Sequence, residues 1–170
     1  MSDQPPVRVA ISLGSNLSEP MVQITQALIE LGQLPSTRLL AQSPLYQSRA
    51  VGPEQPDYIN ACALLETQLA PHDLLDALQA LEQQHQRVRL EHWGPRSLDL
   101  DLLLYGQASI NTERLTVPHA YLRQRNFVLV PLHDIWPEAL LPSGESIASL
   151  RANCTMDGLS PITPQANHKE

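Results

Sequence analysis

The order of strand-like and helix-like segments constrains the fold of this chain more than any other feature of its sequence. Val7, Val9, Ile11 and Leu13 alternate with small or polar residues, which is the period of a half-buried strand. Segments with the periods of helix, strand, strand, helix and strand follow at 18–31, 39–47, 58–67, 71–86 and 97–105. The order β-α-β-β-α-β predicts an α+β fold, the ferredoxin-like βαββαβ sandwich, with helices on one face of an antiparallel sheet.

Turn and cap residues set the boundaries of these segments. Ser18 is expected to cap the first helix and Gly32 to end it, while Pro71 suits the first turn of the second helix. The joint at 49–56 is too rich in Pro and Gly to be regular, and 87–96 has little periodicity, so we expect loops at both places. After the sandwich we expect a C-terminal hairpin at 110–117, short helices from Asn126 and from Ser146, and a loosely held tail at 153–170.

The composition predicts one domain with a small-molecule function. A chain of 170 residues with 42% apolar side chains suffices for a single domain over 1–170, with its core at about 7–150. The net charge of -7 argues against a broad surface for nucleic acid or anionic membrane. The only lysine is Lys169, which excludes a Gly-Lys phosphate loop and disfavours Schiff-base chemistry.

The cysteines and the N-terminus favour a cytoplasmic setting. Cys62 and Cys154 are far apart and have no neighbours at zinc-ligand spacing, so neither a disulfide scaffold nor a zinc site is expected. The first residues lack the pattern of a secretory signal, and no apolar run approaches the roughly 20 residues that span a bilayer. We therefore expect a soluble protein of the cytoplasm.

Two aspartates in the segment 97–105 are the strongest candidates for chemistry. Asp99 and Asp101 alternate with leucines, so a strand would bury the leucines and project both carboxylates from its other face, with Cα atoms roughly 6 to 7 Å apart. Adjacent like charges destabilise a strand unless a cation lies between them, and Mg²⁺ prefers carboxylates combined with substrate phosphates. The alternative is an amphipathic strand whose aspartates only face solvent. Arg87, Arg89 and Arg96 nearby favour a polyphosphate site, although Arg89 also suits a solvated surface.

Four sequence segments resemble one enzyme family. The segment 92–103, HWGPRSLDLDLL, resembles the signature of the 6-hydroxymethyl-7,8-dihydropterin pyrophosphokinases of the folate pathway. Segments 14–17 (GSNL), 55–61 (QPDYINA) and 111–119 (NTERLTVPH) are similar to the same family, and together the likeness covers roughly 7–150.

The resemblance implies a reaction and a set of site residues. The β- and γ-phosphates of ATP would move together to the pterin alcohol and release AMP, with two Mg²⁺ ions held by Asp99 and Asp101. Arg87 and Arg96 match catalytic arginines that bind the phosphates. The residues matching ATP contacts are Gln79, Glu82, Arg87, Arg96, Leu102, Arg114, Thr116, His119 and Arg125. Those matching pterin contacts are Ser48, Val51, Gly52, Tyr58, Asn60, Trp93, Asp99 and Phe127. The expected protein is a monomer whose partners are these two substrates.

The chain also departs from the family pattern. Leu90 stands where a basic residue often occurs, Arg49 where a proline is expected, and Ala120 where a tyrosine is frequent. Tyr121 is one position too late to replace that tyrosine directly. We expect these changes to affect affinity more than the type of reaction.

Other interpretations of the same residues stay open at this point. Tyr58 and Phe127 match the rings that stack on the pterin, but a single aromatic is more often an ordinary core or rim residue. Asp-x-Asp also occurs in sugar-nucleotide transferases, which the short chain and the βαββαβ order disfavour. RNA-binding modules share this layout, but the acidic balance and the paired aspartates oppose that function.

Overall fold

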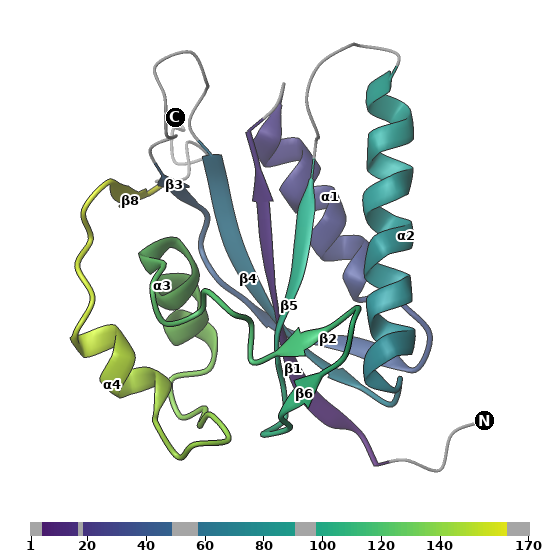
Figure 1. Cartoon of the computed structure of the whole chain (residues 1–170). Coiled ribbons are helices and arrows are strands. Elements are labelled where there is room, and N and C mark those ends of the chain that lie inside the picture. The colour runs from purple at the N-terminus through teal and green to yellow at the C-terminus, as the bar shows by residue number, and fades with distance from the viewer. Residues whose placement is uncertain (1–4, 17–18, 49–57, 91–97, 163–170) are drawn as a thin grey trace.

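A six-stranded antiparallel sheet forms the centre of the molecule (Figure 1). The computed structural model describes residues 5–16, 19–48, 58–90 and 98–162, without the side chains of 86–90. β1 (Val7–Ser15) lies between β4 (Tyr58–Thr67) and β5 (Asp99–Tyr105). β2 (Thr37–Gln42) and β3 (Tyr46–Ser48) share the other edge of β4, and β8 (Leu159–Pro161) pairs with β3.

The predicted strand 39–47 was wrong as a single element, because the structure divides it into β2 and β3. Pro44 lies in the break and has no N–H to donate to a ladder. Ser43 takes over the contact with β4, since its N–H donates to the carbonyl oxygen of Cys62 at 2.9 Å and its Oγ accepts from the N–H of Cys62 at 2.9 Å. The predicted strand at 58–67 is confirmed.

Two helices cover the first face of the sheet. α1 (Pro20–Leu31) and α2 (Pro71–Leu90) direct their leucine stripes against alternate residues of β1, β4 and β5. Each buried leucine contributes about 1.5 to 3 kcal/mol relative to exposure, so this layer supplies much of the stability. The buried side chains shared by helices and strands include Ile11, Leu13, Ile24, Leu28, Leu31, Leu65, Leu74, Leu78, Leu100 and Leu102.

Both helix predictions need correction at one end. Glu19, in a left-handed conformation and without a side-chain cap, precedes α1, whereas Ser18 lies outside the described residues. α2 continues to Leu90, about one turn past the predicted end, so 87–90 are not loop. No Gly or Pro occurs between Arg87 and Leu90, and these side chain types tolerate a helix.

The second face of the sheet is covered only in part, by the C-terminal helices. α3 (Asn126–Ile135) packs on β4 and β1, and α4 (Ile147–Ala152) packs on α3, on the side opposite α1 and α2 (Figure 1). The register of β5 shifts so that Leu102 pairs with Ile11 and Leu104 with Ala10, which leaves Leu103 as an extra residue. Leu103 and Leu104 therefore both belong to the second core.

The C-terminal predictions are confirmed except in the tail. β6 (Ile110–Asn111) and β7 (Thr116–Val117) form the hairpin, and Ser146 caps α4 by accepting from the N–H of Ser149. The prediction of a loose tail from 153 was wrong for β8, which is too short to show a period of its own and depends on pairing with β3. No described helix is long and apolar enough to cross a membrane.

Candidate active site

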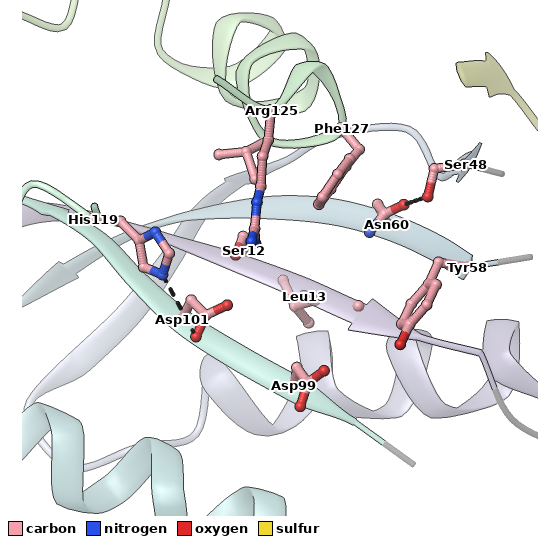
Figure 2. Close-up of a pocket in the computed structure, with 12 residues that line it drawn as sticks. Ser12, Leu13, Ser48, Tyr58, Asn60, Asp99, Asp101, His119, Arg125 and Phe127 are labelled. Carbon is pink, nitrogen blue, oxygen red and sulfur yellow. Dashed lines mark hydrogen bonds and ion pairs between the residues drawn. The ribbon is translucent and has the colours of Figure 1, made fainter. Parts of the chain in front are cut away.

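The uncovered part of the second sheet face holds a pocket of about 380 Å³, which we call the sheet pocket (Figure 2). Its floor follows from strand register, which places Gly14 between Asp99 and Asn60 and places Ser12 beside Asp101. The lining residues are Ser12, Leu13, Gly14, Ser48, Tyr58, Asn60, Asp99, Asp101, His119, Arg125, Phe127 and Val128. The pocket lies where α3 begins and leaves the ends of three strands uncovered.

Both aspartates of β5 face this pocket. Leu100 and Leu102 are buried in the first core, so the alternating strand directs Asp99 and Asp101 to the other side, as predicted. The side chain of Asp101 is 47% exposed, and its Oδ1 lies 4.0 Å from Nε2 of His119. The described residues include no group of three or more His, Cys, Asp or Glu side chains able to hold a metal ion. Two carboxylates fit an ion such as Mg²⁺ only if substrate oxygens and water complete its coordination.

A buried hydrogen bond fixes a polar group in the sheet pocket. Ser48 Oγ donates to Oδ1 of Asn60 at 2.7 Å, and both residues are buried. Because its oxygen is engaged, Asn60 presents its amide nitrogen on the side of Gly14, where an added Cβ would lie 3.4 Å from Nδ2. Glycine at position 14 therefore keeps the floor open next to a hydrogen-bond donor.

Two aromatic rings flank the part of the sheet pocket that contains Asn60 (Figure 2). Tyr58 comes from the start of β4 and Phe127 from the first turn of α3, and both are half-buried. The Arg125 guanidinium lies 5.6 Å from the Phe127 ring centre and 4.3 Å from that of Tyr121. A flat ligand could stack on the rings while the guanidinium meets an anionic group.

Two protonated groups lie behind this pocket. The Tyr46 hydroxyl donates a hydrogen bond to the carboxylate of Asp134. Burial, followed by the contact with Asp134, raises the pKa of Tyr46 well above its ordinary value. Burial likewise raises the pKa of the Cys62 thiol. Neither group is ionised at neutral pH, so neither provides a nucleophile.

A second cavity, of about 320 Å³, lies between α2, β5 and the β6–β7 hairpin, and we call it the hairpin groove. Glu82 is held there because its Oε2 accepts from the N–H of Leu100 at 2.7 Å. The lining residues are Leu75, Gln79, Glu82, Leu100, Asp101, Leu102, Arg114, Leu115, Thr116, His119, Ala120 and Tyr121. Asp101 and His119 line both cavities, so the sheet pocket and the hairpin groove meet at these two residues.

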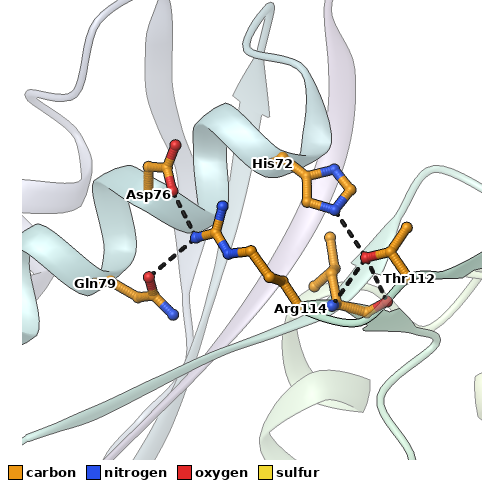
Figure 3. A network of polar contacts seen from close by, with 6 residues as sticks. His72, Asp76, Gln79, Thr112 and Arg114 are labelled. Atoms are coloured by element: carbon orange, nitrogen blue, oxygen red, sulfur yellow. Dashed lines mark hydrogen bonds and ion pairs between the residues drawn. The ribbon is translucent and has the colours of Figure 1, made fainter.

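Polar contacts connect the hairpin to α2 along the groove (Figure 3). Nη2 of Arg114 donates to Oδ1 of Asp76 at 2.6 Å and to Oε1 of Gln79 at 3.1 Å. Nε2 of His72 lies 2.8 Å from Oγ1 of Thr112. His72, Asp76 and Gln79 follow one another at helical spacing, so one row of α2 holds the hairpin.

A family model described as 7,8-dihydro-6-hydroxymethylpterin-pyrophosphokinase (HPPK) matches residues 10–137. The chain belongs to the HPPK family. A 2-amino-4-hydroxy-6-hydroxymethyldihydropteridine pyrophosphokinase of Pseudomonas aeruginosa is 51% identical over 153 residues, which are 89% of this chain and 94% of the relative. A relative of the same description in Haemophilus influenzae is 49% identical over 141 residues, covering 82% of this chain and 88% of that one. The chain is therefore a pyrophosphokinase, a transferase of folate biosynthesis.

Solved structures support the HPPK fold. A wild-type HPPK-DHPS of Plasmodium falciparum with pterin and p-hydroxybenzoate has a TM-score of 0.72 and 14% identity. The similarity covers 96% of this chain and 48% of that chain, so this chain spans about half the length of that structure. At this identity the likeness establishes the fold alone, and it agrees with the predicted ferredoxin-like sandwich.

The HPPK chain brings most of its predicted site residues together. Of the predicted pterin contacts, the sheet pocket contains Ser48, Tyr58, Asn60, Asp99 and Phe127. Of the predicted ATP contacts, the hairpin groove contains Gln79, Glu82, Leu102, Arg114, Thr116 and His119, and the sheet pocket contains His119 and Arg125. Tyr121 lines the groove beside Ala120, so the shift by one position does not remove this ring from the site.

The remaining predicted contacts cannot be placed. Val51, Gly52, Trp93 and Arg96 lie outside the described residues, as does the departure at Arg49. Arg87 and Leu90 belong to the last turn of α2, where only the backbone is described. Their roles stay predictions.

Sequence reasoning missed part of the HPPK pocket floor. Ser12 and Gly14 line it from β1, and Val128 lines it from α3. The signal in β1 was the presence of the small residues Ser12 and Gly14 at alternate positions on an inner strand. No comparable signal distinguishes Val128 from its apolar neighbours.

Proposed function

We propose that this HPPK transfers the pyrophosphoryl group of ATP to 6-hydroxymethyl-7,8-dihydropterin, giving the pterin diphosphate and AMP, a step of tetrahydrofolate biosynthesis. The observation that carries the proposal is the meeting of two cavities at Asp101 and His119. Pterin in the sheet pocket and ATP in the hairpin groove would bring the alcohol and the phosphates to the same place. Proximity of this kind supplies a large part of the rate enhancement in group transfer.

The sheet pocket has the donors and surfaces that a pterin requires. Tyr58 and Phe127 would stack on the flat ring, and the amide of Asn60 would pair with its polar edge. The ring would then point its hydroxymethyl group toward the two aspartates. Val51, Gly52 and Trp93 complete this set as predictions from the family pattern.

Two Mg²⁺ ions are proposed to be held by Asp99 and Asp101. When bound, such ions neutralise phosphate charge and lower the pKa of a coordinated hydroxyl. His119 and Arg125 lie beside the aspartates and are suited to the phosphates, and Arg87 and Arg96 are proposed to contact the transferred group.

The proposed reaction conserves atoms and charge. The hydroxymethyl oxygen forms a bond to the β-phosphorus while the bond from that phosphorus to the α,β-bridging oxygen breaks. AMP leaves with the bridging oxygen, and the hydroxyl proton passes to solvent.

We further propose that the protein is a monomer with one domain over 1–170 and that it is active in the cytoplasm without nucleic acid or membrane. The net charge of -7 supports the absence of polyanionic partners.

The test is the identity of the nucleotide product. Purified protein is mixed with ATP, MgCl₂ and 6-hydroxymethyl-7,8-dihydropterin, and nucleotides are separated by chromatography. We expect AMP and pterin diphosphate in equal amounts, and no product after chelation of the metal with EDTA. Formation of ADP would show single-phosphoryl transfer and refute the proposed reaction.

A further inference from the structure

The C-terminal strand β8 lies directly behind one wall of the sheet pocket. It pairs antiparallel with β3, with Ser48 opposite Leu159, and the N–H of Ile162 donates to the carbonyl oxygen of Leu45 at 2.9 Å. β3 has only three residues and lies between β4 and β8. Without β8 it would be a very short edge strand, an element of low intrinsic stability.

Leu159 has a side-chain partner as well as a backbone partner. It is 6% exposed and forms a small core with Tyr46 of β3 and Val130 of α3, against which Phe127 packs. Tyr46 and Ser48 are two residues apart and share one face of β3. Leu159, opposite Ser48, therefore fills the space between β3 and α3.

The same two elements, β3 and α3, each contribute to the lining of the sheet pocket. β3 carries Ser48, whose hydroxyl determines how the Asn60 amide is oriented, and α3 carries Phe127. The Tyr46 hydroxyl bonded to Asp134 is a second connection between β3 and α3. A shift of β3 would move the Ser48 hydroxyl, and a shift of α3 would move the Phe127 ring.

We infer that β8, through the buried side chain of Leu159, is a positioning element for the pterin-binding wall of this pyrophosphokinase. Leu159 does not line the sheet pocket, so its effect on the pterin would pass through Ser48 and Phe127. The inference rests on the proposed function, because it takes the sheet pocket as the pterin site. It assigns a role to a segment that the sequence predicts to be a loose tail. The hairpin groove is not lined by any described residue of β3, β8 or α3, so ATP affinity should be insensitive to β8.

The test compares the Michaelis constants of the two substrates in Leu159→Ala. We expect KM for the pterin to rise about tenfold, equivalent to about 1.4 kcal/mol of binding, with KM for ATP within about twofold of the wild type. Leu159→Met, which keeps the volume, should restore the pterin KM. The matched control is Leu28→Ala, which removes a buried leucine from α1 in the opposite core. It should lower the melting temperature without a selective change in pterin KM.

Each result decides the question. Equal changes of both KM values, or a lower melting temperature with an unchanged pterin KM, would reduce Leu159 to a purely structural residue and overturn the inference. If Leu159→Ala does not fold, Tyr46→Phe breaks the other connection and is expected to raise the pterin KM selectively by a smaller factor. Failure of the proposed function is recognised separately, because the wild-type protein would then produce no AMP.

Discussion

The two cavities that meet at Asp101 are built in different ways. In the sheet pocket, a buried hydrogen bond joins Ser48 to Asn60 on strands fixed by the central sheet. In the hairpin groove, Arg114 reaches Asp76 across side chains that are 48% and 59% exposed. A buried hydrogen bond is costly to break because the separated groups stay buried and cannot bond to water instead. An exposed ion pair contributes only about 0 to 1 kcal/mol.

If pterin binds the sheet pocket and ATP the hairpin groove, as proposed, the two substrates meet sites of different rigidity. The Asn60 amide and the Tyr58 and Phe127 rings are held by the sheet and by α3, so the sheet pocket can discriminate a rigid heterocycle by shape and hydrogen bonding. The hairpin groove is bounded by a two-stranded hairpin whose polar contacts to α2 compete with water. Such a hairpin can adjust to a flexible nucleotide, but its exposed contacts are weakened by salt.

The largest expected effect belongs to Asp101, one of the two residues that line both cavities. Asp101→Ala removes one of two carboxylates proposed to hold Mg²⁺, and we expect kcat to fall about a thousandfold, or roughly 4 kcal/mol of transition-state stabilisation. The melting temperature should change little, because the side chain is half exposed and near another carboxylate. Rates of AMP formation and thermal unfolding measure the two effects.

The matched control is Asp73→Ala. Asp73 is exposed on α2 and forms no ion pair with another described residue. It should keep full activity. A normal rate in Asp101→Ala would show that the two cavities do not share a metal site at this residue.

The second prediction concerns the sheet pocket. Phe127→Ala removes one of the two proposed stacking rings, and we expect about 2 kcal/mol less pterin binding, or roughly a thirtyfold higher KM, from the lost apolar contact. KM for ATP should stay within a few-fold of the wild type. Steady-state kinetics at saturating second substrate measures both constants. A proportional rise in both would place Phe127 in the general packing of α3, and not in one cavity.

Local pattern predicted the parts of both cavities that come from regular strands. The alternation of residues with a period of two predicts both the strand β4 and the side of β5 from which Asp99 and Asp101 project. This alternation does not depend on how the rest of the chain is arranged. The position of Phe127 in one pocket with Asp99 came from the family pattern, because nothing local brings the start of α3 to the end of β5.

The missed features depend on contacts between distant segments. β8 has three residues and is stabilised by β3, which precedes it by more than a hundred positions. Arg114 meets Asp76 across 38 positions, and no periodicity reports such a pair. The break at Pro44 was visible, but the apolar residues around it favoured one continuous strand.

The third prediction uses pH to perturb the region behind the sheet pocket. The pKa of Tyr46 is raised in the folded state, so this residue contributes stability that is present below the unfolded pKa of about 10 and is lost as pH rises above it. Stability should fall by at most about 1 kcal/mol more between about pH 10 and 11 in the wild type than in Tyr46→Phe. Urea titrations of both proteins measure this difference. Parallel curves would show that Tyr46 ionises as easily when folded as when unfolded.

The smallest expected effect comes from the hairpin groove, and it tests whether the exposed contacts matter for ATP. Asp76→Ala removes one of the two contacts that hold the Arg114 guanidinium against α2, the other being Gln79. We expect KM for ATP to rise by up to about fivefold, which is less than about 1 kcal/mol. Asp76 does not line the groove, so the effect must act through Arg114. KM for the pterin should not change, and Asp73→Ala is again the control on the same helix.

Salt separates this effect from a general loss of the fold. Raising the ionic strength from about 0.05 M to about 0.5 M screens an exposed pair, because the Debye length falls below about 5 Å. The ATP KM ratio between Asp76→Ala and wild type should therefore approach one at high salt, while the pterin KM ratio for Phe127→Ala stays constant. A ratio for Asp76 that is independent of salt would mean that Arg114 is held by packing. The hairpin groove would then be as preformed as the sheet pocket, and the two substrates would be recognised in the same way.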